Sequence, residues 1–169
     1  TVFALSWGTT TLGYTRQQFL LCQLFGVVFF ALTIPLSAVL AERQGRRRTL
    51  IFANVLTVAL GLVLAPLFGA GTLAGVLTFL ALGFAVMGLT YGPLGTALAE
   101  QFPTSVRYTG SSLAFNLAGV FGASLAPYAA TWLASHFGLQ FVGYYLCSAG
   151  VLTLVALALG RETRDDSLI

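Results

Sequence analysis

Lysine is absent from this 169-residue chain, and charge of either sign is scarce: 8 basic and 5 acidic residues make up 8% of the sequence. An ordinary soluble domain carries about 25% charged residues. Hydrophobic residues reach 57%, and the mean hydropathy is +0.90. Because so few polar side chains cannot cover a water-exposed surface, the composition excludes an ordinary soluble protein and indicates a membrane protein.

Cysteine and histidine are also scarce. Cys22 and Cys147 lie in apolar stretches, where a thiol behaves as a small apolar group, so we expect neither a disulfide nor a metal site. His136 is the only histidine. Without a catalytic dyad or a set of metal ligands, we expect a protein that is not an enzyme and uses no cofactor. The arginines are confined to short stretches, so nucleic acid is not an expected partner.

Long uncharged runs separate the charged residues. Residues 17–41 carry no charge, and neither do the 51 residues between Arg48 and Glu100 or the 53 between Arg107 and Arg161. A membrane helix needs about 20 apolar residues, so the first run predicts one crossing and each of the others predicts two. These crossings are expected to be α-helical, because a backbone in lipid must satisfy its own hydrogen bonds. The predicted spans are 18–40, 50–69, 73–98, 111–134 and 141–160.

The arginines predict the orientation of this all-α, polytopic fold in the lipid bilayer. Five crossings place the loops 41–49 and 99–110 and the tail 161–169 on one side, where seven of the eight arginines lie. Short loops rich in arginine stay in the cytoplasm, so we expect these segments and the C-terminus to be cytoplasmic. Residues 1–13 are apolar but too short to span, and we interpret them as the outer end of a preceding helix.

Two loops carry ordered motifs. Residues 38–48 read AVLAERQGRRR, in which an acid ends one helix, Gly45 turns the chain and three arginines begin the next helix. This resembles the G-x-L-A-D-R-x-G-R-R signature of the major facilitator superfamily, with Glu42 in place of the aspartate and Ala38 in place of the glycine. Residues 100–110 read EQFPTSVRYTG and resemble the loop after the tenth helix of symporters in that superfamily.

The resemblance implies the C-terminal six-helix bundle of a twelve-helix transporter. Residues 1–13 would end helix 7, and residues 14–169 would hold helices 8 to 12. The amino-acid sequence of the chain resembles most closely those of the metabolite:proton symporters. These are bacterial inner-membrane carriers of organic acids and osmolytes such as shikimate or proline and betaine. Such a carrier works by alternating access, which requires the N-terminal half that this chain lacks. The expected partners are therefore a small-molecule solute, H+ and that missing half.

The same resemblance implies that the loops help to switch conformation. We expect a cytoplasmic cluster in which Arg43 and Arg107 meet Glu100, with Glu162 as a further member, to hold one conformer. The alternative is that these charges only anchor the helices at the membrane surface. The loop residues expected to act in gating are Glu42, Arg43, Gly45, Arg46, Arg47, Arg48, Glu100 and Arg107.

The substrate pathway is expected among polar residues within the spans, and the clearest candidates are Gln23, Tyr91 and Asn116. Asn116 has an alternative role as a hydrogen-bonding contact between helices, because small residues recur near it at helical spacing. Tyr91 lies beside Pro93, where a kink would serve either gating or shape. No acid lies within any span, so the residue that carries a proton is not found in them.

Other classes of membrane protein stay open at this point. A small oligomeric channel or a structural membrane protein also suits glycine-rich helices with polar stripes. A truncated gene product without function is a further possibility. A channel would conduct ions when reconstituted alone, whereas part of a carrier would not.

Overall fold

The computed structural model describes residues 1–159, and every regular element in that range is helical, as predicted. The predicted tail 161–169, with Glu162, lies outside the described residues. The elements are α1 (Val2–Thr10), α2 (Arg16–Gln44), α3 (Arg46–Phe68), α4 (Leu73–Ala99), α5 (Arg107–Gly119), the π-helix η1 (Val120–Leu125), α6 (Ala126–Phe137) and α7 (Leu139–Leu159).

Within residues 1–159, five stretches are long and apolar enough to cross a membrane, which confirms the predicted number of spans. They are α2, α3, α4, the continuous helix from α5 through η1 to α6, and α7. α1 has nine residues and a length of about 14 Å, which is too short for a crossing. The five long helices make the chain a multi-pass membrane protein.

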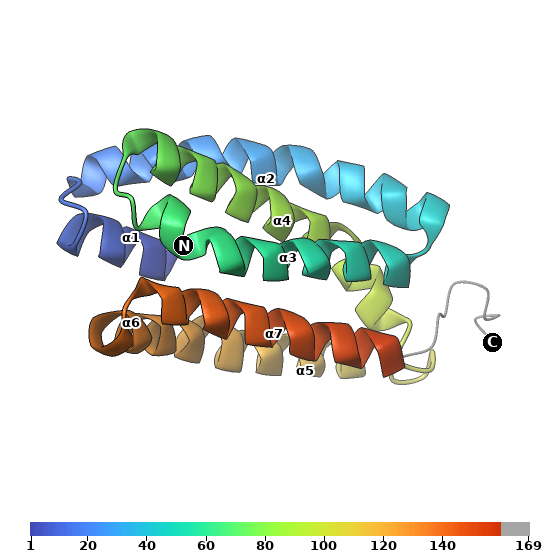
Figure 1. Ribbon diagram of the computed structural model, residues 1–169. Coiled ribbons are helices and arrows are strands. Elements are labelled where there is room, and N and C mark those ends of the chain that lie inside the picture. Colours follow the sequence, from blue (N-terminus) through green and yellow to red (C-terminus); the bar gives the residue numbers. More distant parts are fainter. Residues whose placement is uncertain (160–169) are drawn as a thin grey trace.

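The helices run back and forth between the two ends of an elongated bundle (Figure 1). The α2–α3 and α4–α5 connections lie at one end, here called the arginine end. The α1–α2, α3–α4 and α6–α7 connections lie at the opposite end, where the Tyr14 hydroxyl donates a hydrogen bond to the Gly71 carbonyl (3.0 Å). This alternation is the arrangement that successive membrane crossings require.

The connection predicted over residues 41–49 contracts to the single residue Gly45. α2 continues to Gln44 and α3 begins at Arg46, so the three arginines form the first turn of a helix. Gly45 has φ = +97°, a backbone conformation that side chains with a Cβ rarely adopt, and this allows the abrupt reversal. The second connection spans residues 100–106, shorter than the predicted loop 99–110.

α2 and α4 form the most extensively packed helix pair. A Cβ added at Gly88 would lie 2.7 Å from the carbonyl oxygen of Phe30. One added at Gly92 would lie 2.8 Å from that of Ile34. Ser37 donates a hydrogen bond from Oγ to the Gly88 carbonyl (3.2 Å). Small residues spaced by four thus let the two backbones approach closely, as membrane helices commonly do.

Aromatic side chains fill the core near the opposite end. Phe19 and Phe68 are fully buried, and their rings meet edge to face with centroids 6.3 Å apart. Phe68 also stacks on Phe79 at 4.9 Å. Leu20, Leu24 and many other large apolar side chains of these helices point outward instead, which is the expected arrangement where lipid is the solvent.

The fourth crossing is not the uniform helix that the span 111–134 implied. η1 inserts six π-helical residues between α5 and α6. α6 buries Ala130 and Ala134 and packs against α1 and α7. α5 has no buried residue, so the half of this crossing at the arginine end leaves most of its surface uncovered.

Candidate functional site

The two motif-bearing connections are joined at the arginine end by an ion pair. Arg46, in the first turn of α3, donates from Nη1 to Oε1 of Glu100, which follows the last residue of α4. The Arg46 side chain is 29% exposed and that of Glu100 is 14% exposed. A fully exposed pair is worth about 0–1 kcal/mol. Partial burial strengthens the attraction between the two charges and also raises the cost of removing them from water.

The three consecutive arginines of α3 point in three directions, because successive residues of an α-helix are about 100° apart. Arg46 reaches Glu100. Arg47 donates from Nε to the Leu157 carbonyl (2.7 Å) and from Nη2 to the Ala158 carbonyl (2.8 Å). It thereby satisfies the open carbonyls at the C-terminal end of α7, where a cation is favoured. Arg48 is exposed.

The charge cluster differs from the predicted one. Sequence analysis expected Arg43 beside Glu100, but Arg46 takes that place, because the Gly45 reversal directs the start of α3 toward the end of α4. Arg43 is exposed in the last turn of α2 and makes no ion pair within the described residues. Arg107 donates from Nε to the Phe102 carbonyl (3.3 Å) and so braces its own connection.

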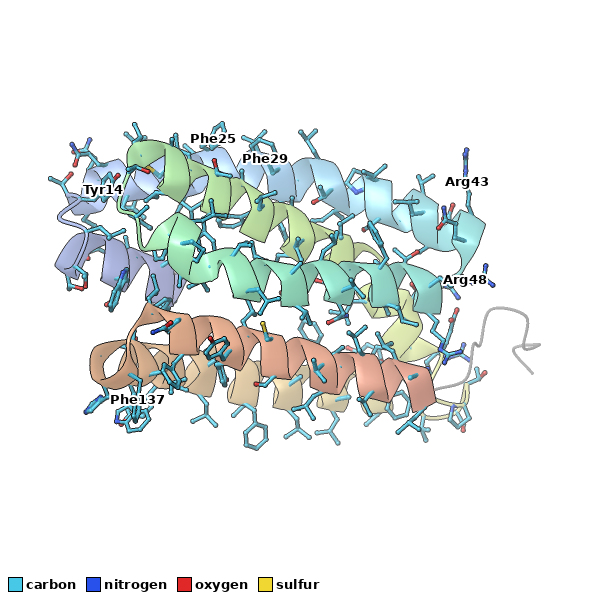
Figure 2. All side chains as sticks on the ribbon, viewed as in Figure 1. Tyr14, Phe25, Phe29, Arg43, Arg48 and Phe137 are labelled. Atoms are coloured by element: carbon cyan, nitrogen blue, oxygen red, sulfur yellow. The ribbon has the colours of Figure 1, made fainter. Side chains whose placement is uncertain are left out.

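Figure 2 shows Arg43 and Arg48 at the arginine end, with Tyr14 and Phe137 at the opposite end of the bundle. Arg43 points away from the helices. Glu42 is exposed next to it. The predicted loop residues are therefore gathered at one end, and the ion pair Arg46–Glu100 links the two loops directly.

The three predicted pathway residues do not meet. Gln23 is half-buried and donates from Nε2 to the Thr1 carbonyl (3.0 Å). Tyr91 is exposed and its ring meets Phe30 edge to face at 5.5 Å. Asn116 is exposed and donates from Nδ2 to the carbonyl of Ser112 in its own helix (2.8 Å), and no hydrogen bond within residues 1–159 joins its side chain to another helix.

A cavity of about 660 Å³ lies elsewhere, between α1, α3, α4, η1 with α6, and α7. Its lining is mainly apolar and holds none of the three predicted residues. Its polar side chains include Asn54, Thr57 and Thr90, which sequence reasoning did not select. The spacing of Asn54 and Thr57, three apart within a span and so on one helix face, was the signal that could have found them.

Asn54 is the most deeply buried of these polar groups, with an exposed fraction of 8%. Its Nδ2 donates to the Leu50 carbonyl (2.9 Å), and no hydrogen bond within the described residues reaches its Oδ1. Thr57 and Thr90 donate to carbonyls of their own helices. The cavity thus offers amide and hydroxyl groups without a charged side chain. Such a lining suits a solute with a neutral hydrogen-bond donor better than a solute with a carboxylate.

Comparison with known proteins agrees with a multi-pass helical membrane protein. Residues 1–168 match the sequence profile described as the Major Facilitator Superfamily. The chain belongs to the major facilitator superfamily. No solved structure gives a significant match.

Several bacterial carriers are similar to the chain. It is 42% identical over 173 residues to the inner membrane metabolite transport protein YhjE of Escherichia coli (strain K12), covering 99% of the chain and 39% of that protein. It is 28% identical to the proline/betaine transporter of Salmonella typhimurium, covering 79% and 27%. It is 26% identical to the shikimate transporter of Escherichia coli (strain K12), covering 97% and 38%. The chain therefore spans about two fifths or less of each relative.

Proposed function

We propose that the chain is the C-terminal half of a secondary active transporter that moves a small metabolite by alternating access. Membership of the superfamily over residues 1–168, together with coverage of 39% of the relative YhjE, is the observation that carries this proposal. In this assignment residues 1–13 end helix 7, and residues 14–169 form helices 8 to 12. An N-terminal half completes the carrier, since alternating access needs two bundles that rock against each other.

The carrier is assigned to the bacterial inner membrane, with the arginine end and the C-terminus in the cytoplasm. The name of the relative YhjE supports the assignment to the inner membrane, and the positions of seven of the eight arginines support the proposed orientation. The ion pair Arg46–Glu100 supports the same sidedness for both loops, because its partners must lie at one face of the bilayer.

The solute is assigned to the organic acids and osmolytes, by analogy with the relatives named for shikimate and for proline and betaine. Coupling to H+ follows from the family resemblance. Among the five described spans the one acid is Glu42, in the last turn of α2 at the arginine end, and none lies deeper in the membrane. The proton-carrying group is therefore assigned to the N-terminal half. That half is also the place for a cation that neutralises a carboxylate solute.

At the arginine end, the pair Arg46–Glu100 is proposed to hold the two cytoplasmic connections together in one conformer of the carrier. Arg47 fixes the end of α7 to the same turn, so one helix start ties α4 and α7 together. Only a network of this kind biases a conformational equilibrium appreciably, because a single exposed pair contributes about 0–1 kcal/mol.

The test is transport by the full-length carrier in proteoliposomes. We expect saturable uptake of radiolabelled shikimate or proline that accelerates under an inward H+ gradient and collapses when a protonophore is added. The 169-residue chain reconstituted alone serves as the control and is expected to give no uptake and no ion current. Single-channel currents from the chain alone would contradict the proposal and favour a channel, and uptake indifferent to the H+ gradient would contradict the coupling.

A further inference from the structure

Two arginines at the arginine end, Arg43 and Arg48, take no part in the contacts that Arg46 and Arg47 make. Arg46 pairs with Glu100 and Arg47 caps α7, but Arg43 and Arg48 are exposed and form no ion pair within the described residues. Figure 2 shows both at the end of the bundle. Within the described residues, each therefore offers a guanidinium without an ion-pair partner at the end of the spans.

Each of these arginines stands at the head of an exposed apolar stripe. On α3, Arg48 is followed on the same helical face by Phe52 and Val55, which are 57% and 50% exposed. On α2, Arg43 is preceded on the same face by Val39 and Leu36, also exposed. Arg46 differs, because Leu50 and Ala53, which follow it at the same spacing, are buried. The stripes below Arg43 and Arg48 thus face away from the bundle.

We propose that Arg43 and Arg48 bind the phosphate groups of anionic phospholipids in the adjoining leaflet, with the acyl chains lying along these stripes. A guanidinium binds phosphate oxygens through two parallel hydrogen bonds, which an ammonium group does not reproduce. Clustered basic residues at the end of membrane helices attract anionic lipid by about 1 kcal/mol each, equivalent to roughly fivefold in affinity.

The combination of charge and stripe favours a lipid over a soluble anion. A free phosphate would use the guanidinium alone, whereas a phospholipid also covers the apolar side chains below it. Arg48 is the stronger of the two sites, since no acid lies within four residues of it, while Glu42 is next to Arg43 in the chain. The inference rests on the membrane location of the chain and on these two faces meeting lipid in the proposed carrier, not its N-terminal half, and it does not depend on the solute.

The experiment measures lipid retained by the purified full-length protein. Detergent-solubilised protein is titrated with 1-palmitoyl-2-oleoyl phosphatidylglycerol, and bound lipids are counted by native mass spectrometry. R48Q is expected to weaken binding about fivefold, and R43Q/R48Q more than tenfold. R48K keeps the charge but loses the paired hydrogen bonds, so an intermediate loss is expected. F52A is expected to weaken phosphatidylglycerol binding without changing the affinity for glycerol 3-phosphate.

R107Q is the matched control. It removes the same charge at the same end, but Arg107 donates to a backbone carbonyl and is followed one turn later by Gly110 and Ser111 instead of large apolar side chains. Its lipid binding is expected to equal that of the unaltered protein. An equal loss in R107Q and R48Q would overturn the inference, because net charge alone would explain it. Unchanged binding in R43Q/R48Q, or displacement of the lipid by millimolar inorganic phosphate, would also overturn it.

Discussion

Replacing Gly88 by alanine is expected to destabilise the bundle by about 2 kcal/mol and to lower its thermal midpoint by about 5 °C. The added Cβ would overlap Thr33 Oγ1 and lie 2.7 Å from the carbonyl oxygen of Phe30 in α2. Backbone atoms cannot move aside as a flexible side chain does, so α2 and α4 must separate. The hydrogen bond from Ser37 to the Gly88 carbonyl would then be lost as well. Differential scanning fluorimetry of the purified protein measures the shift.

Gly95 provides the matched control in the same helix. A Cβ added there meets no atom within 4 Å, so G95A introduces the same methyl group without a clash. Because alanine favours helix over glycine by up to about 1 kcal/mol, G95A is expected to leave the midpoint unchanged or to raise it slightly. Equal midpoints for G88A and G95A would show that the close approach of α2 and α4 does not hold the bundle together.

Replacing Glu100 by glutamine in the full-length carrier is expected to reduce uptake about tenfold, the equivalent of about 1.4 kcal/mol. The variant leaves Arg46 without its carboxylate at a half-buried position, which disfavours the conformer that the pair holds. The charge-reversed double variant R46E/E100R is expected to recover most of the uptake. Initial rates in proteoliposomes, normalised to folded protein, measure both effects.

Arg43 is the matched control for this prediction. It lies in the last turn of α2, on the other side of Gly45 from Arg46, and was the expected partner of Glu100, but it is exposed. R43Q is therefore expected to retain near-normal uptake, whereas R46Q should behave like E100Q. If R43Q abolished uptake while R46Q did not, the pairing predicted from the sequence would be the functional one. Normal uptake in E100Q and R46Q would reduce the pair to an anchor without a role in gating.

The fold could be predicted from the positions of the charges. Crossing a membrane excludes charged residues from long stretches, so the uncharged runs 17–41, 49–99 and 108–160 indicated the number and order of spans. The predicted positions of the helix ends were less accurate. A span inferred from hydropathy stops at the first charge, but Arg46, Arg47 and Arg48 form a helical turn beyond the apolar region.

The ion pair could not be derived from the sequence alone. Arg43 and Arg46 lie on either side of Gly45 at similar distances along the chain from Glu100. Which of them reaches the carboxylate depends on the reversal at Gly45 and on the angle between α3 and α4. The prediction that an arginine of the first motif pairs with Glu100 was correct, but the arginine is Arg46 and not Arg43.

The cavity was missed for a related reason. Gln23, Tyr91 and Asn116 were selected because they are polar within apolar spans, but polarity does not say which way a side chain faces. In the structure Tyr91 and Asn116 face outward. Asn54 faces the cavity because it lies on the buried face of α3 with Leu50 and Leu64. Helical phase relative to neighbouring helices decides such exposure, and tertiary packing sets that phase.

Sidedness of the connections tests the central claim most directly. After Cys22 and Cys147 are replaced by alanine, single cysteines are introduced at the exposed positions Gln44, Thr104, Thr11 and Ser135, and intact cells are treated with a membrane-impermeant maleimide. A carrier half with its arginine end in the cytoplasm predicts labelling at positions 11 and 135 and protection at 44 and 104 until the cells are opened. Labelling of 44 and 104 on opposite sides of the membrane would contradict the account.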